Sequence, residues 1–433
     1  MMIKASLLSL YRVASFCLQP LAGPFLRLRL RQGKEDSVRL EEKRGLPGLA
    51  RPAGRLIWLH GASVGEALAL RPLMQRLIDQ GFKVLLTTGT ATSARLVQSQ
   101  LGSGALHQFA PLDGPLFVRR FLDHWAPDLA LFAESELWPN MFRALARRDI
   151  PLFLVNARMS PRSARRWARF PGTIAALLRD VRFCLAQSEV DADNLAELGM
   201  PAVLSVGNLK YDAAAPAADA RALTRLSGAI GPRPTWLAAS THPGEEALIA
   251  RAHASAMAQI PGLLTIIAPR HHQRGVMIAA DLARGGFQTA LRSRGELPDP
   301  QCQIYIADSM GEMGVLFRAA PIVLMGKSLA LESTTPGGGQ NPIEPAKLGC
   351  AVLHGPLVSN FAATYNALDE ACGALLVPDE AALTLALLLL FRDTALMRKM
   401  ARSAQETVMG MTGASDHTMA ALAPWLNALK APA

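Results

Sequence analysis

The 433-residue sequence lacks several features on which particular classes of protein depend. Its five cysteines are scattered and form no Cys-x-x-Cys pair, which argues against a structural zinc site and a disulfide framework and suits a reducing compartment. There are only four tyrosines, and the sequence shows neither an RNA-binding signature nor a helix-turn-helix pattern. We therefore expect no nucleic acid as a partner.

Motifs for metal and nucleotide chemistry are also missing. The sequence contains no Walker-type lysine motif, no His-Glu-x-x-His motif and no Asp-rich metal motif. We expect neither a metal ion nor a cofactor. What the chain does have is an excess of basic residues, with a formal net charge of +10. That charge implies an anionic partner, such as an anionic lipid or a phosphorylated substrate.

Residues 1–50 are predicted to be a membrane-associated segment. The run from Val13 to Leu26 is uncharged, but Pro20 and Pro24 interrupt it, and a clean span needs about 20 apolar residues. Four basic residues then follow, namely Arg27, Arg29, Arg31 and Lys34. Such a segment can lie in the interface with its basic flank on anionic head groups. The alternative is an ordinary N-terminal helix packed on the first domain, but the positive charge after the apolar run favours the membrane.

Strands and helices alternate from Arg55 to about Lys210, which indicates βαβ units and a mostly parallel sheet. The expected strands are Arg55–His60, Lys83–Thr87, Leu129–Ala133, Leu152–Val155, Phe183–Ala186 and Val203–Val206. The expected helices include Ala67–Gln80, Thr92–Leu101 and Pro139–Arg148. Residues 51–210 would form the first domain. Residues 211–234 are rich in Ala and Pro and weakly patterned, so they are predicted to be a linker.

The same alternation restarts in the second half, so residues 235–415 are predicted to form a second domain. Its expected strands are Thr235–Ser240, Leu263–Ala268, Gln303–Ala307, Ile322–Met325, Ala351–His354 and Ala374–Val377. The simplest α/β architecture has two doubly wound, Rossmann-like domains that face each other across a cleft. The C-terminal helices, from Asp379 to about Leu429, are expected to pack back across that cleft, with 416–433 as the last helix.

Glu66 stands where the first strand gives way to a helix, and doubly wound domains place ligands at the carboxyl ends of their strands. Glu66 would therefore face the crevice. However, Ser63 and Glu66 also fit a capping box, in which both side chains satisfy free amides at a helix start. Pro72 would lie in the third turn of a helix that began at Ser63, at the cost of a hydrogen bond. If the helix begins near Arg71 instead, Glu66 lies on a free loop, and both interpretations stay open.

A second pair of acids, Glu134 and Glu136, directly follows the predicted strand Leu129–Ala133. In a domain that already presents Glu66 in the same crevice, they make a plausible acid/base group. The alternative is that they only complement the start of a helix opened by Pro139.

In the second half, polar residues also collect after predicted strands. Arg270 and Arg274 follow one strand and suit a phosphate or a carboxylate, although a solvated basic loop is the alternative. The glycine-containing stretch Asp308–Phe317 and the stretches Gly326–Ser328 and Gly337–Glu344 follow two others. Backbone amides at such helix starts bind phosphate oxygens well.

Eight motifs follow one another along the chain. They are His60-Gly-Ala-Ser-Val-Gly-Glu66, Glu134-Ser-Glu-Leu-Trp-Pro-Asn140, Asn156-Ala-Arg-Met-Ser160, Gly207-Asn-Leu-Lys-Tyr-Asp212, Ser240-Thr-His-Pro-Gly-Glu-Glu246, Pro269-Arg-His271, Asp308-Ser-Met-Gly-Glu-Met-Gly314 and Asn341-Pro-Ile-Glu344. Together they resemble the bacterial 3-deoxy-D-manno-octulosonic acid (Kdo) transferases, and the similar region runs from about residue 10 to residue 415. As an ordered set they are highly specific, unlike any one of them alone.

The resemblance implies a GT-B glycosyltransferase on the cytoplasmic face of the inner membrane. It implies transfer of Kdo from CMP-Kdo to a lipid A precursor (lipid IVA), with inversion at the anomeric carbon. The family's general base falls on Glu66, and its essential acid falls on Glu134, where Ser135 replaces the usual threonine. The family's donor-binding residues fall on Ser240, Thr241, Arg270, Gly311, Glu312, Gly314, Asn341 and Glu344. Two departures affect donor contacts: Gln340 stands where the family often has His, and Lys327 where it often has Gly.

The chemistry of that reaction suits these residues. A sugar hydroxyl is a poor nucleophile, which a carboxylate activates by accepting its proton. The donor carbon develops oxocarbenium character as CMP leaves, by analogy with glycoside cleavage. CMP has a single phosphate, which arginine and helix amides can stabilise without a metal. Two alternatives stay open: a GT-B enzyme that uses a different nucleotide sugar, and a non-catalytic membrane adaptor in which the acids only cap helices.

Overall fold

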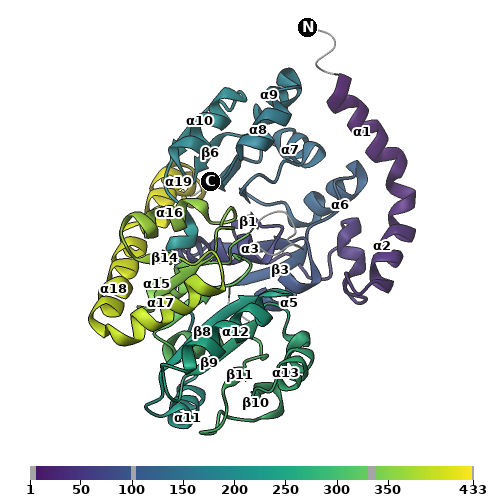
Figure 1. Ribbon diagram of the computed structural model, residues 1–433. Helices are drawn as coiled ribbons and strands as arrows, with labels where there is room; N and C mark the ends of the chain where they lie inside the picture. The colour runs from purple at the N-terminus through teal and green to yellow at the C-terminus, as the bar shows by residue number, and fades with distance from the viewer. Residues whose placement is uncertain (1–5, 99–103, 330–337, 432–433) are drawn as a thin grey trace. The chain divides into compact units, whose positions relative to one another are not determined.

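The computed structural model describes residues 6–98, 104–329 and 338–431, which fall into two compact units (Figure 1). The first unit contains the residues up to Ala213 together with the C-terminal stretch from Thr412. The second unit contains Ala214–Met411. In each unit the described residues form a parallel sheet of seven strands with helices packed against it, which confirms the predicted α/β class.

The sheet of the first unit has the strand order β3-β2-β1-β4-β5-β6-β7. Its strands are β1 (Leu56–His60), β2 (Lys83–Thr88), β3 (Ala105–Phe109), β4 (Leu129–Ala133), β5 (Leu152–Ala157), β6 (Phe183–Ala186) and β7 (Val203–Ser205). The order reverses between β1 and β4, which pair directly, with Leu59 opposite Leu131. Ligands of doubly wound sheets bind beyond the carboxyl ends of the strands at such a reversal. The residues after β1 and β4 therefore occupy the position expected for a site.

Helices cover both faces of this sheet, so β1 is buried along its whole length. The face that includes Trp58 and Phe132 packs against α6 (Pro115–Trp125), α7 (Pro139–Ala146), α9 (Pro171–Leu178) and α10 (Glu189–Glu197). The face that includes Ile57 and Leu131 packs against α3 (Val64–Ala69), α4 (Arg71–Asp79) and α19 (Ala414–Lys430). The unit also contains α5 (Ala91–Gln98) and α8 (Pro161–Trp167).

The second unit repeats this plan with the strand order β10-β11-β9-β8-β12-β13-β14, which reverses between β8 and β12. Its strands are β8 (Thr235–Thr241), β9 (Leu264–Pro269), β10 (Thr289–Leu291), β11 (Ile304–Ile306), β12 (Ile322–Met325), β13 (Ala351–His354) and β14 (Ala374–Leu376). Its helices are α11 (Ala220–Ile230), α12 (Glu245–Met257), α13 (Gly275–Arg284), α14 (Met313–Ala319), α15 (Ile343–Lys347), α16 (Ala362–Glu370), α17 (Glu380–Arg392) and α18 (Thr394–Gly410). Trp236 and Ile267 belong to a core that the sheet shares with α12, α13, α17 and α18.

Every strand predicted from the sequence is present, but β3 and β10, each at one edge of its sheet, were not predicted. In β3 the buried polar residues His107 and Gln108 interrupt the apolar pattern, and β10 has only three residues. The single helix expected over Ala67–Gln80 is in fact two helices, α3 and α4, which meet at Leu70. Pro72 lies in the first turn of α4, where its missing N–H costs no hydrogen bond.

The chain passes from the first unit to the second after Ala213 and returns at Thr412, and both boundaries differ from the predicted ones. Residues 211–234 are not simply a linker, because α11 lies within them and belongs to the second unit. At the other end, α17 and α18 belong to the second unit, whereas α19 returns to the first. Asp212 fixes this return by accepting hydrogen bonds from the backbone N–H groups of Gly413 (2.7 Å) and Ser415. Trp425 of α19 packs edge-on against Phe153, with 4.9 Å between the ring centroids.

The N-terminal segment of the first unit contains α1 (Ser6–Leu18) and α2 (Ala22–Arg31), joined by the 3-10 turn η1 (Gln19–Leu21). In Figure 1 these purple helices run along one side of the first unit, where α1 contacts α6, α7 and α9. Within the described ranges, no helix is long and apolar enough to cross a membrane. Attachment of this segment to a membrane stays a prediction.

Candidate active site

Glu66 lies in the first turn of α3, just beyond the carboxyl end of β1. The hydroxyl oxygen of Ser63 accepts a hydrogen bond from the Glu66 N–H (3.3 Å), and the hydroxyl donates one to Glu66 Oε1 (2.7 Å). Glu66 Oε2 accepts a hydrogen bond from the backbone N–H of Ala62 (2.8 Å). The interpretation with Glu66 on a free loop is therefore wrong, and the carboxylate takes part in a capping arrangement. These bonds also fix its orientation.

The negative charges of two other acids, Glu134 and Glu136, also affect the Glu66 carboxylate. Burial is the largest cause that raises the pKa of Glu66, and the negative charges of Glu134 and Glu136 raise it further. The hydrogen bonds from Ser63 and Ala62 oppose this shift without cancelling it. A carboxylate with a raised pKa is a stronger proton acceptor. The predicted acid/base residues after β1 and β4 are thus brought together.

Glu134 ends β4 in a left-handed backbone conformation, with φ of 54°. Its Oε1 lies 2.7 Å from Nζ of Lys210 in an ion pair that is mostly buried. Lys210 belongs to the 3-10 turn η3 (Leu209–Tyr211), which Asn156 holds by accepting a hydrogen bond from the Leu209 N–H (2.9 Å). The sequence did not single out Lys210, because its partner lies 76 positions away and no local pattern connects them.

Glu136 accepts a hydrogen bond from the indole N–H of Trp138 (2.7 Å), and its Oε2 lies 3.9 Å from Nε2 of buried His60. Burial tends to raise the pKa of Glu136, but the contacts with His60 and Trp138 outweigh it, so that this pKa lies below the usual range. At the other end of the same motif, Asn140 donates a hydrogen bond to the hydroxyl of Ser15 in α1 (2.9 Å). The motif therefore links the acid cluster to the N-terminal segment.

In the second unit a buried carboxylate, Glu245, connects the loops on both sides of the strand reversal. Its oxygens accept hydrogen bonds from the backbone N–H groups of His242 (2.8 Å), Lys327 (2.8 Å), Ser328 (3.1 Å) and Leu329 (3.2 Å). Burial nevertheless raises the pKa of Glu245. The sequence did not predict this role of Glu245, which depends on loops more than 80 positions apart.

The ends of β8 and β12 approach each other closely beside this carboxylate. A Cβ atom on Gly326 would lie 2.4 Å from the carbonyl oxygen of Ser240, so only glycine fits there. Ser240 and Lys327 both adopt left-handed backbone conformations, with φ of 57° and 54°. The buried hydroxyl of Thr241 donates a hydrogen bond to Glu246 (2.9 Å). The predicted donor residues Ser240 and Thr241 thus lie at the reversal.

Positive charge surrounds the same loops. Arg270 is exposed at the end of β9, and no side-chain hydrogen bond or ion pair engages its guanidinium within the described part of the chain. Burial, followed by the charges of Lys327 and other nearby cations, lowers the pKa of His242 to about 4. Gln340 donates a hydrogen bond to Nε2 of this neutral His242 (3.1 Å). The arrangement suits an anionic ligand.

Two other residues predicted to bind a ligand, Arg274 and Glu312, form ion pairs with side chains of the protein itself. Arg274 forms two hydrogen bonds with Glu246 (2.8 and 3.0 Å), so its charge is already neutralised. Glu312 is bound by Arg292 (2.6 and 2.5 Å) and by the hydroxyl of Ser309, and these bonds lower its pKa. The pairing of Arg274 with Glu246 leaves Arg270 as the more available of the two arginines, and binding of an anion by either stays a prediction.

The remaining predicted donor residues lie after β11 and at the start of α15. Gly311 has φ of 80°, and a Cβ on Gly314 would lie 2.0 Å from the carbonyl oxygen of Ala217. Asn341 donates a hydrogen bond to Glu344 (3.2 Å), whose pKa is raised by burial. Part of the glycine-rich stretch, residues 330–337, lies outside the described residues. Among those that are described, no group of three or more His, Cys, Asp or Glu residues could hold a metal ion.

Two solved structures share the plan of two parallel sheets. A UDP-GlcNAc 2-epimerase from Neisseria meningitidis is similar over 86% of this chain and 100% of its own, with a TM-score of 0.58 and 15% identity. A glycosyltransferase from Rickettsia africae is similar over 88% of this chain and 100% of its own, with a TM-score of 0.56 and 12% identity. The fold is therefore of the type found in GT-B glycosyltransferases.

The sequence relatives are more specific. Residues 38–213 match a family described as 3-deoxy-D-manno-octulosonic-acid transferase (kdotransferase). The chain is 36% identical to the transferase of that name from Bordetella pertussis over 386 residues, which cover 87% of this chain and 89% of the relative. It is 32% identical to that of Haemophilus influenzae over 416 residues, 94% of this chain and 96% of the relative. The chain belongs to the 3-deoxy-D-manno-octulosonic acid transferase family and is a Kdo glycosyltransferase, which confirms the resemblance seen in its motifs.

Proposed function

We propose that the chain transfers Kdo from CMP-Kdo to a lipid A precursor, lipid IVA, in lipopolysaccharide synthesis at the cytoplasmic face of the inner membrane. Transfer inverts the anomeric carbon, and Glu66 is the general base. The observation that supports this most directly is the raised pKa of Glu66 among acids at the strand reversal of the first unit.

In the proposed reaction, Glu66 accepts the proton of an acceptor hydroxyl while that oxygen bonds to the anomeric carbon of Kdo. The bond from this carbon to the phosphate oxygen breaks, and CMP leaves with the electron pair. The Ala62 N–H and the Ser63 hydroxyl hold the Glu66 carboxylate in place. Glu134 keeps negative charge beside Glu66, and Lys210 limits the resulting repulsion.

The second unit supplies the donor site in this proposal. CMP-Kdo has one phosphate and the carboxylate of Kdo, so it needs positive charge rather than a metal. Arg270 and Lys327 provide that charge close to the loops that Glu245 connects. The predicted donor residues lie at the end of β8, between β11 and the start of α14, and at the start of α15; they are Ser240, Thr241, Gly311, Glu312, Gly314, Asn341 and Glu344. Of these, Glu312 acts through Arg292 by fixing the loop after β11.

The N-terminal helices support attachment to an anionic membrane. Large apolar side chains on α1 and η1 are exposed, with exposed fractions of 63% for Leu10, 60% for Phe16 and 59% for Leu21. Such a surface normally contacts a partner or a lipid phase. Beside it lies a cavity of about 370 Å³ between α1, α7 and α9. The basic residues that line it are Arg12, Arg143, Arg147 and Arg179, and they suit the phosphates of lipids.

Purified protein incubated with CMP-Kdo and lipid IVA should give a product heavier by one or more Kdo residues, measured by mass spectrometry. Release of CMP should accompany it. UDP- and GDP-sugars should neither replace CMP-Kdo nor compete with it. Unchanged lipid IVA in the presence of CMP-Kdo, with the protein folded, would contradict the proposal.

A further inference from the structure

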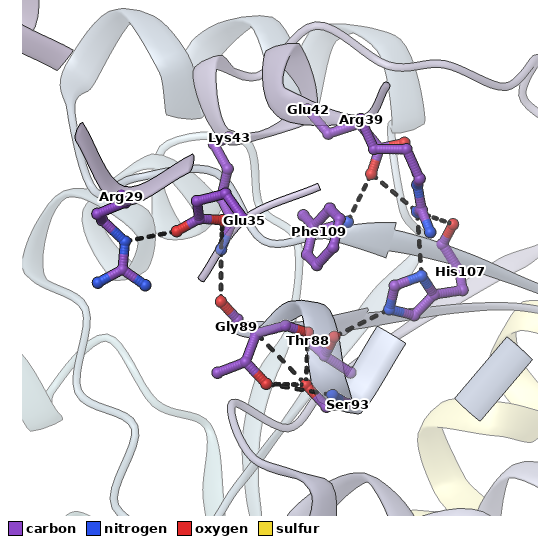
Figure 2. Close-up of polar contacts among 11 residues, drawn as sticks. Arg29, Glu35, Arg39, Glu42, Lys43, Thr88, Gly89, Ser93, His107 and Phe109 are labelled. Atoms are coloured by element: carbon purple, nitrogen blue, oxygen red, sulfur yellow. Dashed lines mark hydrogen bonds and ion pairs between the residues drawn. The ribbon is translucent and has the colours of Figure 1, made fainter. Parts of the chain in front are cut away.

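A short 3-10 helix of the first unit, η2 (Leu40–Arg44), places two charged side chains in the protein interior. Glu42 is 5% exposed and Lys43 is 6% exposed. Figure 2 shows that they belong to two sets of polar contacts, which join residues 29–44 to β3 and to the loop after β2. Burying a charged side chain destabilises a protein unless its partners compensate, so the contacts of Glu42 and Lys43 must offset the burial of their charges.

The first set of contacts ends at the loop after β2. Nζ of Lys43 donates a hydrogen bond to the carbonyl oxygen of Gly89 (2.5 Å). Its nearest carboxylate, Glu35, lies 4.0 Å away and is itself bound by Arg29 (2.5 Å). Burial lowers the pKa of Lys43, although the charge of Glu35 opposes that change. The closest partner of the ammonium group is thus a backbone carbonyl and not an acid.

The Gly89 carbonyl that Lys43 binds belongs to a residue in contact with Ala62, in the loop that leads to Glu66. The N–H of Gly89 donates a hydrogen bond to the carbonyl oxygen of Ala62 (2.9 Å). The N–H of Ala62 in turn donates to Oε2 of Glu66 (2.8 Å). The two loops are in close contact, because a Cβ on Gly89 would lie 2.9 Å from the Ala62 oxygen.

We propose that Lys43 is a positioning residue for Glu66 and acts through Gly89 and Ala62. By holding the Gly89 carbonyl, its ammonium group fixes the loop after β2 against the loop after β1. This contact directs the Ala62 N–H at the Glu66 carboxylate. The inference rests on the proposed role of Glu66 as the general base, and it makes the N-terminal segment part of the machinery that orients the base.

The second set of contacts provides a matched control. Arg39 donates hydrogen bonds to Glu42 (2.9 and 2.8 Å) and to the carbonyl oxygen of His107 (2.9 Å), and Glu42 accepts one from the Phe109 N–H (2.7 Å). These bonds fasten the same N-terminal segment to β3. Within the described residues they do not include the loops that hold Glu66.

The test compares Lys43→Met with Arg39→Met, alongside the wild type and Glu66→Gln. Both methionine variants should lose stability, because Arg39→Met leaves the buried Glu42 carboxylate without its cation and Lys43→Met leaves the Gly89 carbonyl without its donor. Only Lys43→Met should lower kcat, by roughly 10-fold for a misplaced base, with the KM for CMP-Kdo unchanged. Only Lys43→Met should also speed hydrogen exchange in the peptide that contains Ala62.

The pH profile adds a second readout. The Ala62 N–H favours the charged form of Glu66, whereas Glu134 and Glu136 disfavour it. Loosening the Ala62 contact should therefore move the acid limb of kcat/KM to higher pH in Lys43→Met and leave it in place in Arg39→Met. Gly89→Ala disturbs the same contact from the other side and should reproduce the Lys43→Met profile if that variant fails to fold.

The inference is wrong if Lys43→Met and Gly89→Ala match Arg39→Met in kcat, acid limb and hydrogen exchange while Glu66→Gln is inactive. Normal turnover in Glu66→Gln would instead overturn the proposed role of Glu66 as the general base. Faster exchange at Ala62 in Lys43→Met would in that case still establish the contact between the loops. The two failures are therefore distinguishable.

Discussion

Four non-glycine residues beside the candidate sites adopt left-handed backbone conformations. Glu134 and Asn156 do so in the first unit, and Ser240 and Lys327 in the second. For an L-amino acid this conformation costs about 1–2 kcal/mol, least for Asn, so surrounding contacts must maintain it. Such strain tends to collect at functional sites. Here the left-handed residues Glu134 and Lys327 directly follow or lie just beyond the ends of β4 and β12.

The backbone of Lys327 gives a prediction about stability and donor binding. Lys327→Gly and Lys327→Ala both remove the ammonium group, so both should weaken CMP binding, measured by calorimetry, to the same extent. Only glycine relieves the left-handed strain of φ 54°. The free energy of unfolding of the glycine variant should therefore exceed that of the alanine variant by about 1 kcal/mol. Equal stability of the two variants in urea denaturation would contradict this account of the backbone.

Among single residues, the sequence identified Glu66 but could not decide between capping and catalysis. The structure shows why, since one carboxylate makes the capping contacts and also has its pKa raised by burial and by the charges of Glu134 and Glu136. Lys210 and Glu245 were missed for a different reason. Their partners come from distant strand ends, which only the folded sheet brings together.

At the scale of elements, the N-terminal helices are the part of the first unit with the most exposed apolar surface. Deleting Met1–Leu26 should weaken binding to anionic liposomes while both units stay folded. Charged substitutions at exposed Leu10 and Phe16 should have the same effect, because they make the outer face polar without touching Ser15, which binds Asn140. Co-sedimentation with liposomes measures binding, and circular dichroism checks the fold. Undiminished co-sedimentation of the truncated protein would rule out the anchor.

The packing of the N-terminal segment on β3 predicts a loss of stability in acid. Burial, followed by the charges of Arg39 and Lys43, lowers the pKa of His107 to about 3, whereas an unfolded histidine titrates near about 6.5. Between these values the unfolded state binds more protons, so the free energy of unfolding falls as the pH decreases through that window.

His107→Gln should remove part of this pH dependence, although it also lowers stability at neutral pH by disturbing the contacts with Thr88 and Arg39. Urea denaturation between about pH 7 and about pH 5 tests this. An unchanged slope of stability against pH in the variant would show that His107 does not stay neutral in the folded protein.

The central strands were predictable from sequence because both of their faces are buried, which leaves short, continuous apolar runs. Leu129–Ala133, Phe183–Ala186, Ile322–Met325 and Ala351–His354 were predicted with the bounds that the structure shows. The edge strands β3 and β10 lack this pattern, whereas β7 and β14 at the opposite edges were predicted. In β3, His107 and Gln108 are buried because they bind Thr88 and Trp125, a compensation that only the tertiary structure reveals.

At the scale of the whole molecule, the chain passes between the units twice. The sequence predicted that the C-terminal helices pack back, but not that only α19 joins the first unit. The return of α19 depends on two amides bound by Asp212 and on the packing of Trp425 against Phe153. These contacts join residues about 200 or more positions apart, so no local pattern could predict them. The fold class and the family, by contrast, follow from alternation and from ordered motifs.

The whole enzyme is predicted to work without a metal ion. CMP has a single phosphate, and Arg270 and Lys327 supply positive charge near the loops of the second unit. Activity should therefore survive exhaustive chelation, measured as Kdo transfer after dialysis against a chelator. Turnover that is lost in chelator and restored by added magnesium would contradict this prediction.

The most direct test of the central claim is the turnover of Glu66→Gln. Glutamine keeps the shape of the side chain and can accept from Ala62 and donate to Ser63, so the melting temperature and the affinity for CMP-Kdo should change little. It cannot accept the proton, and general base catalysis is worth about 10²–10⁴-fold, so turnover should fall by that order. Normal turnover in a folded Glu66→Gln enzyme would contradict the assignment of Glu66 as the general base.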